Sequence, residues 1–136
     1  MIGYVTVGTN DFENAAAFYD KLFEILGHKR MMGSEEGFIA WGTFDGEAAG
    51  FGLIKPHDKE PATVGNGTIV ALVADTPETV DKAHAKALEL GGTDEGAPGP
   101  RDMPGFYAGY FRDLDGNKLN VFHMDMSKMA LSLIHI

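Results

Sequence analysis

The feature that most constrains the fold of this chain is an internal repeat. When the sequence is shifted by 65 positions, residues 4–7 (Tyr-Val-Thr-Val) fall on residues 69–72 (Ile-Val-Ala-Leu). Both runs are apolar or β-branched, which is typical of buried strands. The correspondence continues without a gap over about 25 residues, which indicates that the two halves are structural copies.

A helix is predicted after each of these strands. In the first half, Phe18, Leu22 and Leu26 recur every four residues and therefore share one helix face. Gly27 and Gly92 fall in register, and we expect each to end its helix with a positive φ angle. In the second half the same stripe consists of Val80, Ala83, Ala87 and Leu90.

Both helices also carry a start signal. Asn10 and Asp75 each stand three residues before a glutamate, Glu13 and Glu78, which is the spacing of a capping box. Pro77 suits a first helical position because the missing N–H would have no partner there. The two helix starts are thus predicted at equivalent places.

Three strands are expected after each helix, near residues 29–33, 37–44 and 48–55 in the first half and near 93–96, 105–112 and 117–124 in the second. Asp45-Gly46 and Asp115-Gly116 are hairpin signals before the last strand of each half. Aligning these turns requires a shift of 70, so the second unit has five extra residues. We place them in loop 96–105, which is too rich in Gly and Pro for a strand and is either a lid or an ordinary connection.

The element order predicts an α+β fold of two tandem βαβββ units. We expect a single domain over residues 1–124, with units at about 1–60 and 66–124, forming a curved mixed sheet or half-barrel around a cavity. The tail, residues 125–136, is apolar and has no counterpart in the first unit. It covers a barrel edge, joins a dimer contact, or is partly foreign sequence appended to the protein.

Composition limits the classes of partner. The net charge of -9 repels nucleic acid and anionic membranes and weakly favours neutral or cationic small molecules. No cysteine is present, which excludes disulfides, thiolate metal sites and cysteine nucleophiles. The N-terminus does not read as a signal peptide and no run is long and apolar enough for a membrane span, so we expect a cytoplasmic protein.

Four segments carry a family resemblance: residues 4–11, 17–23, 65–71 and 111–119. The last is the most specific, because Phe-Arg-Asp-Leu-Asp-Gly-Asn is similar to a family ending F-x-D-P-D-G-N-x-x-E, with Leu114 in place of proline. Over residues 2 to about 124 the chain resembles the vicinal oxygen chelate superfamily, which comprises glyoxalases, bleomycin resistance proteins and extradiol dioxygenases. The resemblance implies that each unit forms a curved half-barrel and that two units enclose a cavity.

The same resemblance implies four metal-ligand positions, in the first and last strands of each unit. They fall at Tyr4, near Gly50, at Ile69 and at Asn120, where metal-dependent members carry His, Glu or Gln. Glycine and isoleucine offer no donor atom, and a protonated tyrosine and a neutral asparagine are weak ligands. We therefore expect no metal and no other cofactor.

The predicted cavity is aromatic and apolar with few polar groups, which is the usual character of a small-molecule site. Taken singly, each aromatic residue could simply fill the core. The aromatic rings could also hold a cation. The candidate ligand-binding residues are Tyr4, Trp41, Ile69, Tyr107, Tyr110, Phe111, Asn120 and Phe122.

No catalytic residue can be assigned from spacing. The sequence has no nucleophile elbow, no phosphate-binding loop and no paired His–Glu motif. His84 is expected on a helix face rather than in a metal site. His123 lies three residues after Asn120, so strand alternation points it away from the cavity unless a bulge intervenes.

The leading hypothesis is a metal-free protein that binds an apolar, aromatic or cationic small molecule, by sequestration or sensing. One alternative is an enzyme of the same superfamily with an atypical site, a glyoxalase-type lyase or isomerase or a dioxygenase, with Tyr4 or Tyr110 as a possible proton donor. Another is an interaction protein whose cavity is fully packed. Because half-barrels leave sheet edges exposed, we also expect a homodimer, with units paired within one chain or exchanged between chains.

Overall fold

A computed structural model describes residues 1–34, 37–43 and 48–134. The first unit has one helix and four strands in the order expected. These elements are β1 (Tyr4–Gly8), α1 (Phe12–Ile25), β2 (Arg30–Ser34), β3 (Phe38–Trp41) and β4 (Gly50–Ile54).

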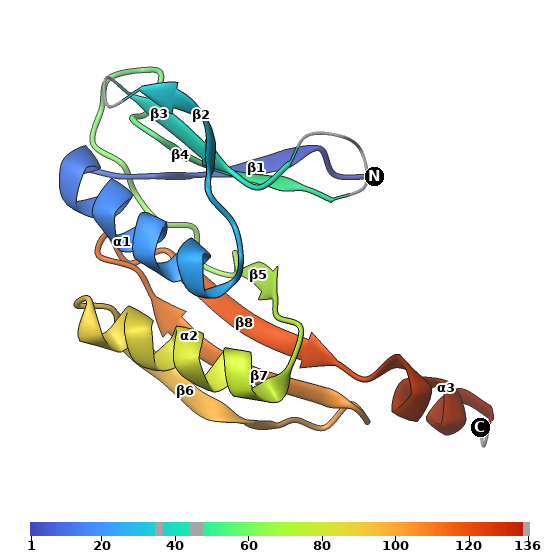
Figure 1. Ribbon diagram of the computed structural model, residues 1–136. Helices are drawn as coiled ribbons and strands as arrows, with labels where there is room; N and C mark the ends of the chain where they lie inside the picture. The colour runs from blue at the N-terminus through green and yellow to red at the C-terminus, as the bar shows by residue number, and fades with distance from the viewer. Residues whose placement is uncertain (35–36, 44–47, 135–136) are drawn as a thin grey trace.

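The second unit repeats this order and is followed by one more helix. Its elements are β5 (Val70–Val73), α2 (Pro77–Glu89), β6 (Thr93–Pro100), β7 (Phe106–Arg112) and β8 (Lys118–Met124), and the extra helix is α3 (Met126–Ile134). In Figure 1, α3 projects away from both sheets. Neither α3 nor any other described helix is both long and apolar enough to cross a membrane.

Each unit forms its own four-stranded mixed sheet. The strand orders are β1-β4-β3-β2 and β5-β8-β7-β6. The pairs β1–β4 and β5–β8 are parallel, and all other neighbouring strands are antiparallel. Figure 1 shows the two sheets one above the other, with α1 between them and α2 against the second sheet. The sheets are not closed into a barrel, and the predicted α+β fold of two βαβββ units is confirmed.

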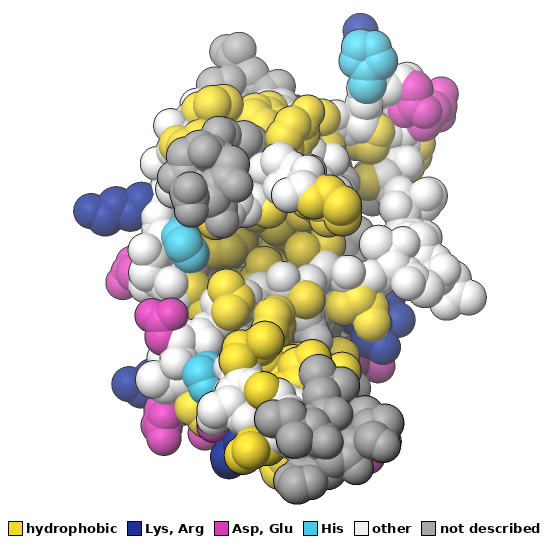
Figure 2. Space-filling view, turned by 90° about the vertical axis from the view of Figure 1, so that its right-hand side faces the viewer, with side chains coloured by type: hydrophobic (Ala, Val, Ile, Leu, Met, Phe, Trp, Pro, Cys, Tyr) yellow, Lys and Arg dark blue, Asp and Glu magenta, His cyan; other side chains and the backbone are white. Residues whose placement is uncertain are grey.

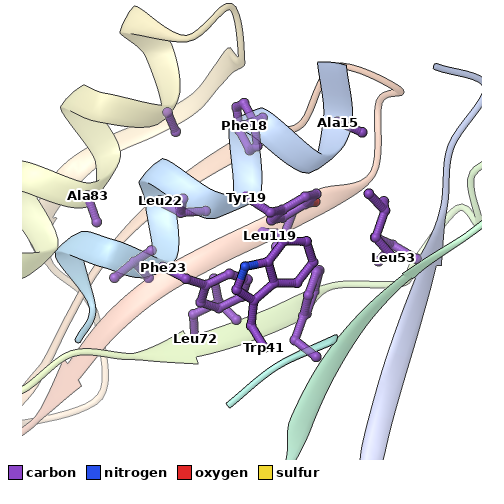
Figure 3. Packing of buried hydrophobic residues seen from close by; sticks show 14 of the residues in the cluster. Ala15, Phe18, Tyr19, Leu22, Phe23, Trp41, Leu53, Leu72, Ala83 and Leu119 are labelled. Carbon is purple, nitrogen blue, oxygen red and sulfur yellow. The ribbon is translucent and has the colours of Figure 1, made fainter. Parts of the chain in front are cut away.

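The core lies where α1 meets both sheets (Figure 3). Tyr19 and Phe23 of α1 pack on Trp41 of the first sheet, and Phe18 packs on Phe111 of the second. The predicted helix stripes are confirmed, because Phe18, Leu22, Val80, Ala83 and Ala87 are all buried. One continuous apolar cluster therefore joins the two units.

The helix ends differ by one residue from the prediction. The N-caps are Asp11 and Thr76, whose side chains accept from the N–H groups of Asn14 and Thr79, so the expected caps Asn10 and Asp75 lie one residue outside. Each helix begins later because the cap is the residue whose side chain reaches the N–H three positions on.

The predicted C-terminal glycine is correct for the first helix and differs by one residue for the second. Gly27 has φ 85° after the cap residue Leu26, as predicted. In the second unit the residue with positive φ is Gly91, at 104°, and not Gly92. Gly92 is required for another reason: a Cβ there would lie 2.8 Å from the carbonyl oxygens of Ala87 and Arg112.

The prediction that residues 96–105 form a loop is wrong for its first half. Strand β6 continues to Pro100, with register irregularities around Gly96 and between Gly96 and Gly99. This is possible because β6 is an edge strand, where proline needs no ladder hydrogen bond and bulges accommodate glycine. The actual loop is restricted to residues 101–105.

The remaining strands appear within a few residues of their predicted positions. The Asp115-Gly116 turn is confirmed, since Gly116 has φ 92° and its N–H donates to the Asp113 carbonyl. Asp45-Gly46, the other predicted turn, lies outside the described residues.

Strand pairing corrects the alignment of the last strands. Tyr4 pairs with Gly50 in the first sheet, but Asn120 pairs with Ala71 and not with Ile69 in the second. With the shift of 65 kept for the first strands, the counterpart of Asn120 is therefore Gly52 rather than Gly50. The connection from β3 to β4 has more residues than the connection from β7 to β8. The sequence alignment matched the Asp-Gly pairs of these two connections, and it therefore placed the following strands, β4 and β8, two residues out of register.

Candidate ligand cleft

An apolar cleft of about 260 Å³ lies between the two units. One wall comes from the C-terminal turn of α1 and from β3 and β4, and the other comes from β5 and β8. In Figure 2, apolar side chains gather around a hollow between the upper and lower parts of the molecule. The lining residues are Phe23, Leu26, His28, Trp41, Gly42, Thr43, Ala48, Ala49, Phe51, Ala71, Leu72, Val73 and Phe122.

Trp41 is fixed in the wall of this cleft. Its ring stacks on Phe23 at 5.5 Å, and its Nε1 donates a 3.0 Å hydrogen bond to Asp20. Asp20 also accepts two hydrogen bonds from Arg30. Burial raises the pKa of Asp20, but the hydrogen bonds from Arg30 and Trp41 outweigh it and bring the pKa below its usual value. The indole is thus held by an ionised carboxylate.

Asn120 places an unused acceptor on the open face of the second sheet. It is only 5% exposed, and its Oδ1 has no hydrogen-bond partner among the described residues. Its cross-strand neighbours are Ala71 and Tyr110, and Phe122 follows two residues along the same face. A buried acceptor without a partner costs about 1–3 kcal/mol, which a ligand with an N–H or O–H donor would recover.

Four of the eight predicted site residues share this face by strand alternation, and Tyr4 lies on the corresponding face of the first sheet. Tyr4 is 58% exposed, Ile69 is also exposed, and the Tyr110 ring lies within cation–π range of Arg101 and Lys118. Of these five, only Phe122 borders the cleft itself. The set consists of Tyr4, Ile69, Tyr110, Asn120 and Phe122.

The other three predicted residues point toward the helices. Trp41 is buried against α1 and reaches the cleft with one edge. Phe111 is fully buried between Phe18 and His84. Tyr107 donates a 2.6 Å hydrogen bond to Asp81 of α2. Phe111 and Tyr107 therefore lie on the opposite face of the second sheet from Asn120 and Tyr110, and Trp41 lies on the helix-facing side of the first sheet.

Several lining residues were not among the predicted site residues. Phe23 and Leu26 come from the end of α1, Phe51 from β4, and Leu72 and Val73 from β5. The helix stripe places Leu26 toward a core, but no sequence signal shows that the core opens there. The cleft arises only from the way in which the first unit meets β5.

The residues at the implied metal-ligand positions do not fit a metal ion. Tyr4 and Gly50 are adjacent in the first sheet, and Ala71 and Asn120 are adjacent in the second, so the positions supply only one phenol and one amide oxygen. Ile69 adds no donor atom. Within residues 1–34, 37–43 and 48–134, no group of three or more His, Cys, Asp or Glu side chains is placed to hold a metal.

The buried His84 also does not provide such a site. Its Nε2 lies 3.1 Å from both Asp94 Oδ1 and the carbonyl oxygen of Tyr110. Both partners only accept hydrogen bonds, so Nε2 carries the proton and joins α2 to β6 and β7.

The fold and cleft together define a protein of paired βαβββ units around an apolar opening. A model of the Glyoxalase/Bleomycin resistance protein/Dioxygenase superfamily matches residues 1–121. The chain therefore belongs to this superfamily, and the resemblance seen in the sequence is confirmed.

Similar solved structures agree with this assignment. A glyoxalase/bleomycin resistance protein from Albidiferax ferrireducens T118 is 36% identical, with a TM-score of 0.83, and the match covers 92% of this chain and 99% of that one. A glyoxalase/bleomycin resistance protein/dioxygenase family enzyme from Burkholderia phytofirmans PsJN is 21% identical, with a TM-score of 0.70 over 90% and 98% of the two chains.

More distant structures share the fold alone. Lactoylglutathione lyase from Agrobacterium tumefaciens is 20% identical, with a TM-score of 0.65, and the match covers 90% of this chain and 92% of that one. The search among curated proteins gave no match.

Proposed function

We propose that this protein binds an apolar, aromatic or cationic small molecule without a metal ion, in the cleft between its two units, and acts by sequestration or sensing. The observation that carries the proposal is the unpartnered Oδ1 of Asn120, on the face whose next residue along, Phe122, lines the apolar cleft. Apolar walls with few polar groups are typical of a small-molecule site, and the Asn120 acceptor lies beside this cleft rather than in its lining.

The chemistry of the walls supports this ligand class. Aromatic rings of Phe23, Trp41, Phe51 and Phe122 surround the space, and His28 is the one ionisable side chain among the described lining residues. Ring faces attract cations, and the net charge of -9 favours a cation over an anion. A ligand that extends past Phe122 toward Asn120 would in addition need a hydrogen-bond donor.

A homodimer is part of the proposal. Tyr4, Ile69 and Val73 are large apolar side chains left exposed on or beside β1 and β5, which are edge strands of the two open sheets. Open sheet faces and edges of this kind are usually covered by another surface. A second copy of the chain would cover these faces and narrow the opening of the cleft.

The test combines metal uptake with ligand binding. Purified protein is incubated with Mn, Fe, Co, Ni and Zn, desalted and analysed by plasma mass spectrometry, and we expect far less than one ion per chain. Trp41 is the only tryptophan, so its fluorescence reports ligand binding. The protein is titrated with toluene, which has neither a donor nor a charge, with aromatic amines that contain no indole ring, and with the cation benzyltrimethylammonium. Saturable changes are expected for the donor-bearing or cationic aromatic compounds.

A pair of matched variants locates the binding. Ala71→Leu fills the cleft, whereas Ala85→Leu makes the same change on the exposed side of α2. The first variant should abolish the fluorescence change and the second should keep it. Equal responses in both variants would rule out the cleft, and near-stoichiometric uptake of one metal would favour the alternative, an enzyme of the superfamily with an atypical site.

A further inference from the structure

A second, larger pocket lies at the other end of the second unit. It has a volume of about 560 Å³ and is bordered by loop 101–105, by the ends of β7 and β8 and by the start of α3. Its apolar walls include Pro77, Pro104 and Phe106, and its polar groups include Tyr107 and His123. All of the described lining residues come from the second unit and α3, so the described part of the first unit takes no part in this pocket.

The wall of this pocket is held by backbone hydrogen bonds. Within the loop, Arg101 N–H donates to the Phe106 carbonyl and Phe106 N–H donates to the Met103 carbonyl. The Asp125 N–H donates to the Gly105 carbonyl over 2.8 Å, which ties the loop to the exit of β8. Gly105 has φ 82°, and a Cβ there would lie 2.5 Å from the Asp125 carbonyl oxygen. The pocket is therefore preformed, which reduces the entropic cost of binding.

Tyr107 and His123 are direct cross-strand partners in this pocket. Side chains opposite each other in antiparallel strands have Cβ atoms about 4.5–5.5 Å apart, so the two side chains leave their strands next to each other on the same face. Each already has one fixed partner: the Tyr107 hydroxyl contacts Asp81 Oδ1 at 2.6 Å, and His123 Nδ1 contacts the Ala74 carbonyl at 3.1 Å.

These partners determine where the protons lie. The Asp81 carboxylate and the Ala74 carbonyl only accept hydrogen bonds, so the Tyr107 hydroxyl and His123 Nδ1 must donate to them. The remaining lone pair of the Tyr107 oxygen and His123 Nε2 in the neutral ring are then both acceptors. Among the described residues, no donor is recorded for either atom. The pocket thus offers two acceptor atoms for which no donor is recorded among the described residues.

Charges around the pocket largely balance. Arg101 and Lys128 contribute positive charge, and Asp81 and Asp125 contribute negative charge. The Arg101 guanidinium donates to the carbonyls of Ala97, Gly99 and Pro100, so it is bound to the end of β6. Neither an anion nor a cation is favoured by this balance.

We infer that this pocket is a binding site for a small neutral molecule with an apolar body and a hydroxyl donor, such as a phenol. The ligand hydroxyl donates to His123 Nε2, with the Tyr107 oxygen as a second acceptor in the same pocket, and its apolar body packs on Pro77, Pro104 and Phe106. The site is separate from the cleft, because Trp41 and Phe122 do not line it.

The test is a calorimetric and NMR titration with phenol and three probes of similar size. Anisole has no donor, benzoate is an anion and trimethylanilinium is a cation. Phenol should bind at least about tenfold more tightly than each of them, since one hydrogen bond contributes about that factor. Phenol should also shift the His123 imidazole signals. Equal affinity for phenol and anisole would overturn the inference.

Variants assign the binding to this pocket. His123→Phe keeps an aromatic ring without the acceptor and should weaken phenol at least about tenfold, whereas His57→Phe makes the same change in an exposed loop and should not. His123→Gln retains an acceptor and should recover part of the affinity for phenol. This variant also replaces His123→Phe in the test if circular dichroism shows that the Phe variant is poorly folded. Unchanged phenol binding in both His123 variants would refute the site.

Failure here is distinguishable from failure of the proposed cleft. Phenol binding that survives Ala71→Leu and leaves Trp41 fluorescence unchanged belongs to the second pocket. Phenol binding that is lost in Ala71→Leu but kept in His123→Phe belongs to the cleft, and it would overturn the inference while supporting the proposed function.

Discussion

The hydroxyl of Tyr19 donates a 2.6 Å hydrogen bond to Oδ2 of Asp113, which is 94 positions away in the sequence. Tyr19 lies in α1 of the first unit, and Asp113 begins the turn between β7 and β8 of the second. Asn117 also donates to Asp113 Oδ2 and to the Gly8 carbonyl, and Asp115 accepts from the Asn10 N–H. Residues 111–119, the segment with the most specific family resemblance, therefore connect the two units by hydrogen bonds.

Removal of the Tyr19 hydroxyl tests whether this connection stabilises the fold. Tyr19→Phe should lower the free energy of unfolding by about 1–3 kcal/mol, because a buried hydrogen bond to a carboxylate is lost. Urea denaturation measures the change. Tyr110→Phe is the control, since the Tyr110 hydroxyl has no recorded hydrogen bond to the described residues and should give a change within about 0.5 kcal/mol. Equal effects in the two variants would contradict the proposed role of Tyr19.

The pH dependence of stability should carry the signature of Asp113. Burial raises the pKa of Asp113 above the ordinary aspartate value of 3.8 and outweighs the hydrogen bonds from Tyr19 and Asn117, which lower it. Since the folded-state pKa is higher than the unfolded one, this group stabilises the fold at low pH relative to high pH, and the contribution is lost as the pH rises from 3.8 through the folded-state pKa.

Asp113→Asn isolates that contribution. The stability advantage of the wild type over this variant should shrink as the pH is raised through this window, as measured by urea denaturation at several pH values. An advantage that grows with pH would mean that hydrogen bonding, and not burial, controls the pKa of Asp113.

Asn120 should lower the stability of the free protein. Replacement by Leu, which is similar in size, removes a buried acceptor without a partner, and we expect the unfolding free energy to stay the same or rise by up to about 2 kcal/mol. The same variant should bind donor-bearing ligands less tightly. A loss of more than about 1 kcal/mol in stability would show that the amide has a structural partner.

The cap of α2 distinguishes the observed helix start from the predicted one. Thr76→Ala should cost about 1 kcal/mol, because the Thr79 N–H loses its 3.1 Å acceptor. Asp75→Ala, at the position that the capping-box spacing suggested, should cost much less. Thermal denaturation of both variants checks the order, and the reverse order would restore Asp75 as the cap.

Gly109 should not tolerate a side chain. A Cβ there would lie 3.0 Å from the His84 ring and 3.1 Å from Pro98, so Gly109→Ala should cost about 1–3 kcal/mol through overpacking. Gly3→Ala is the matched control, because no atom lies within 4 Å of its added Cβ. Chemical denaturation of both variants measures the difference. Similar values would show that α2 can shift away from the sheet.

The local elements of this protein could be predicted from its sequence because their causes are local. The repeat, the helix stripes around Phe18 and Val80 and the Asp115-Gly116 turn all depend on periodicity or on backbone preferences within a few residues. Where the prediction failed, neighbouring strands were responsible. β6 runs through Pro98 and Gly99 because it lies at a sheet edge, a position that no local signal contains.

The sequence by itself therefore determined the βαβββ repeat, the superfamily and the lack of good metal ligands at Tyr4, Gly50, Ile69 and Asn120. The tertiary structure decided which faces those strands present and where space remains. The helices cover the sheet faces that carry Trp41, Tyr107 and Phe111. The register of β7 and β8 pairs Tyr107 with His123. Alternation along a strand fixes which residues share a face, but only packing between units and strand register decide what that face meets.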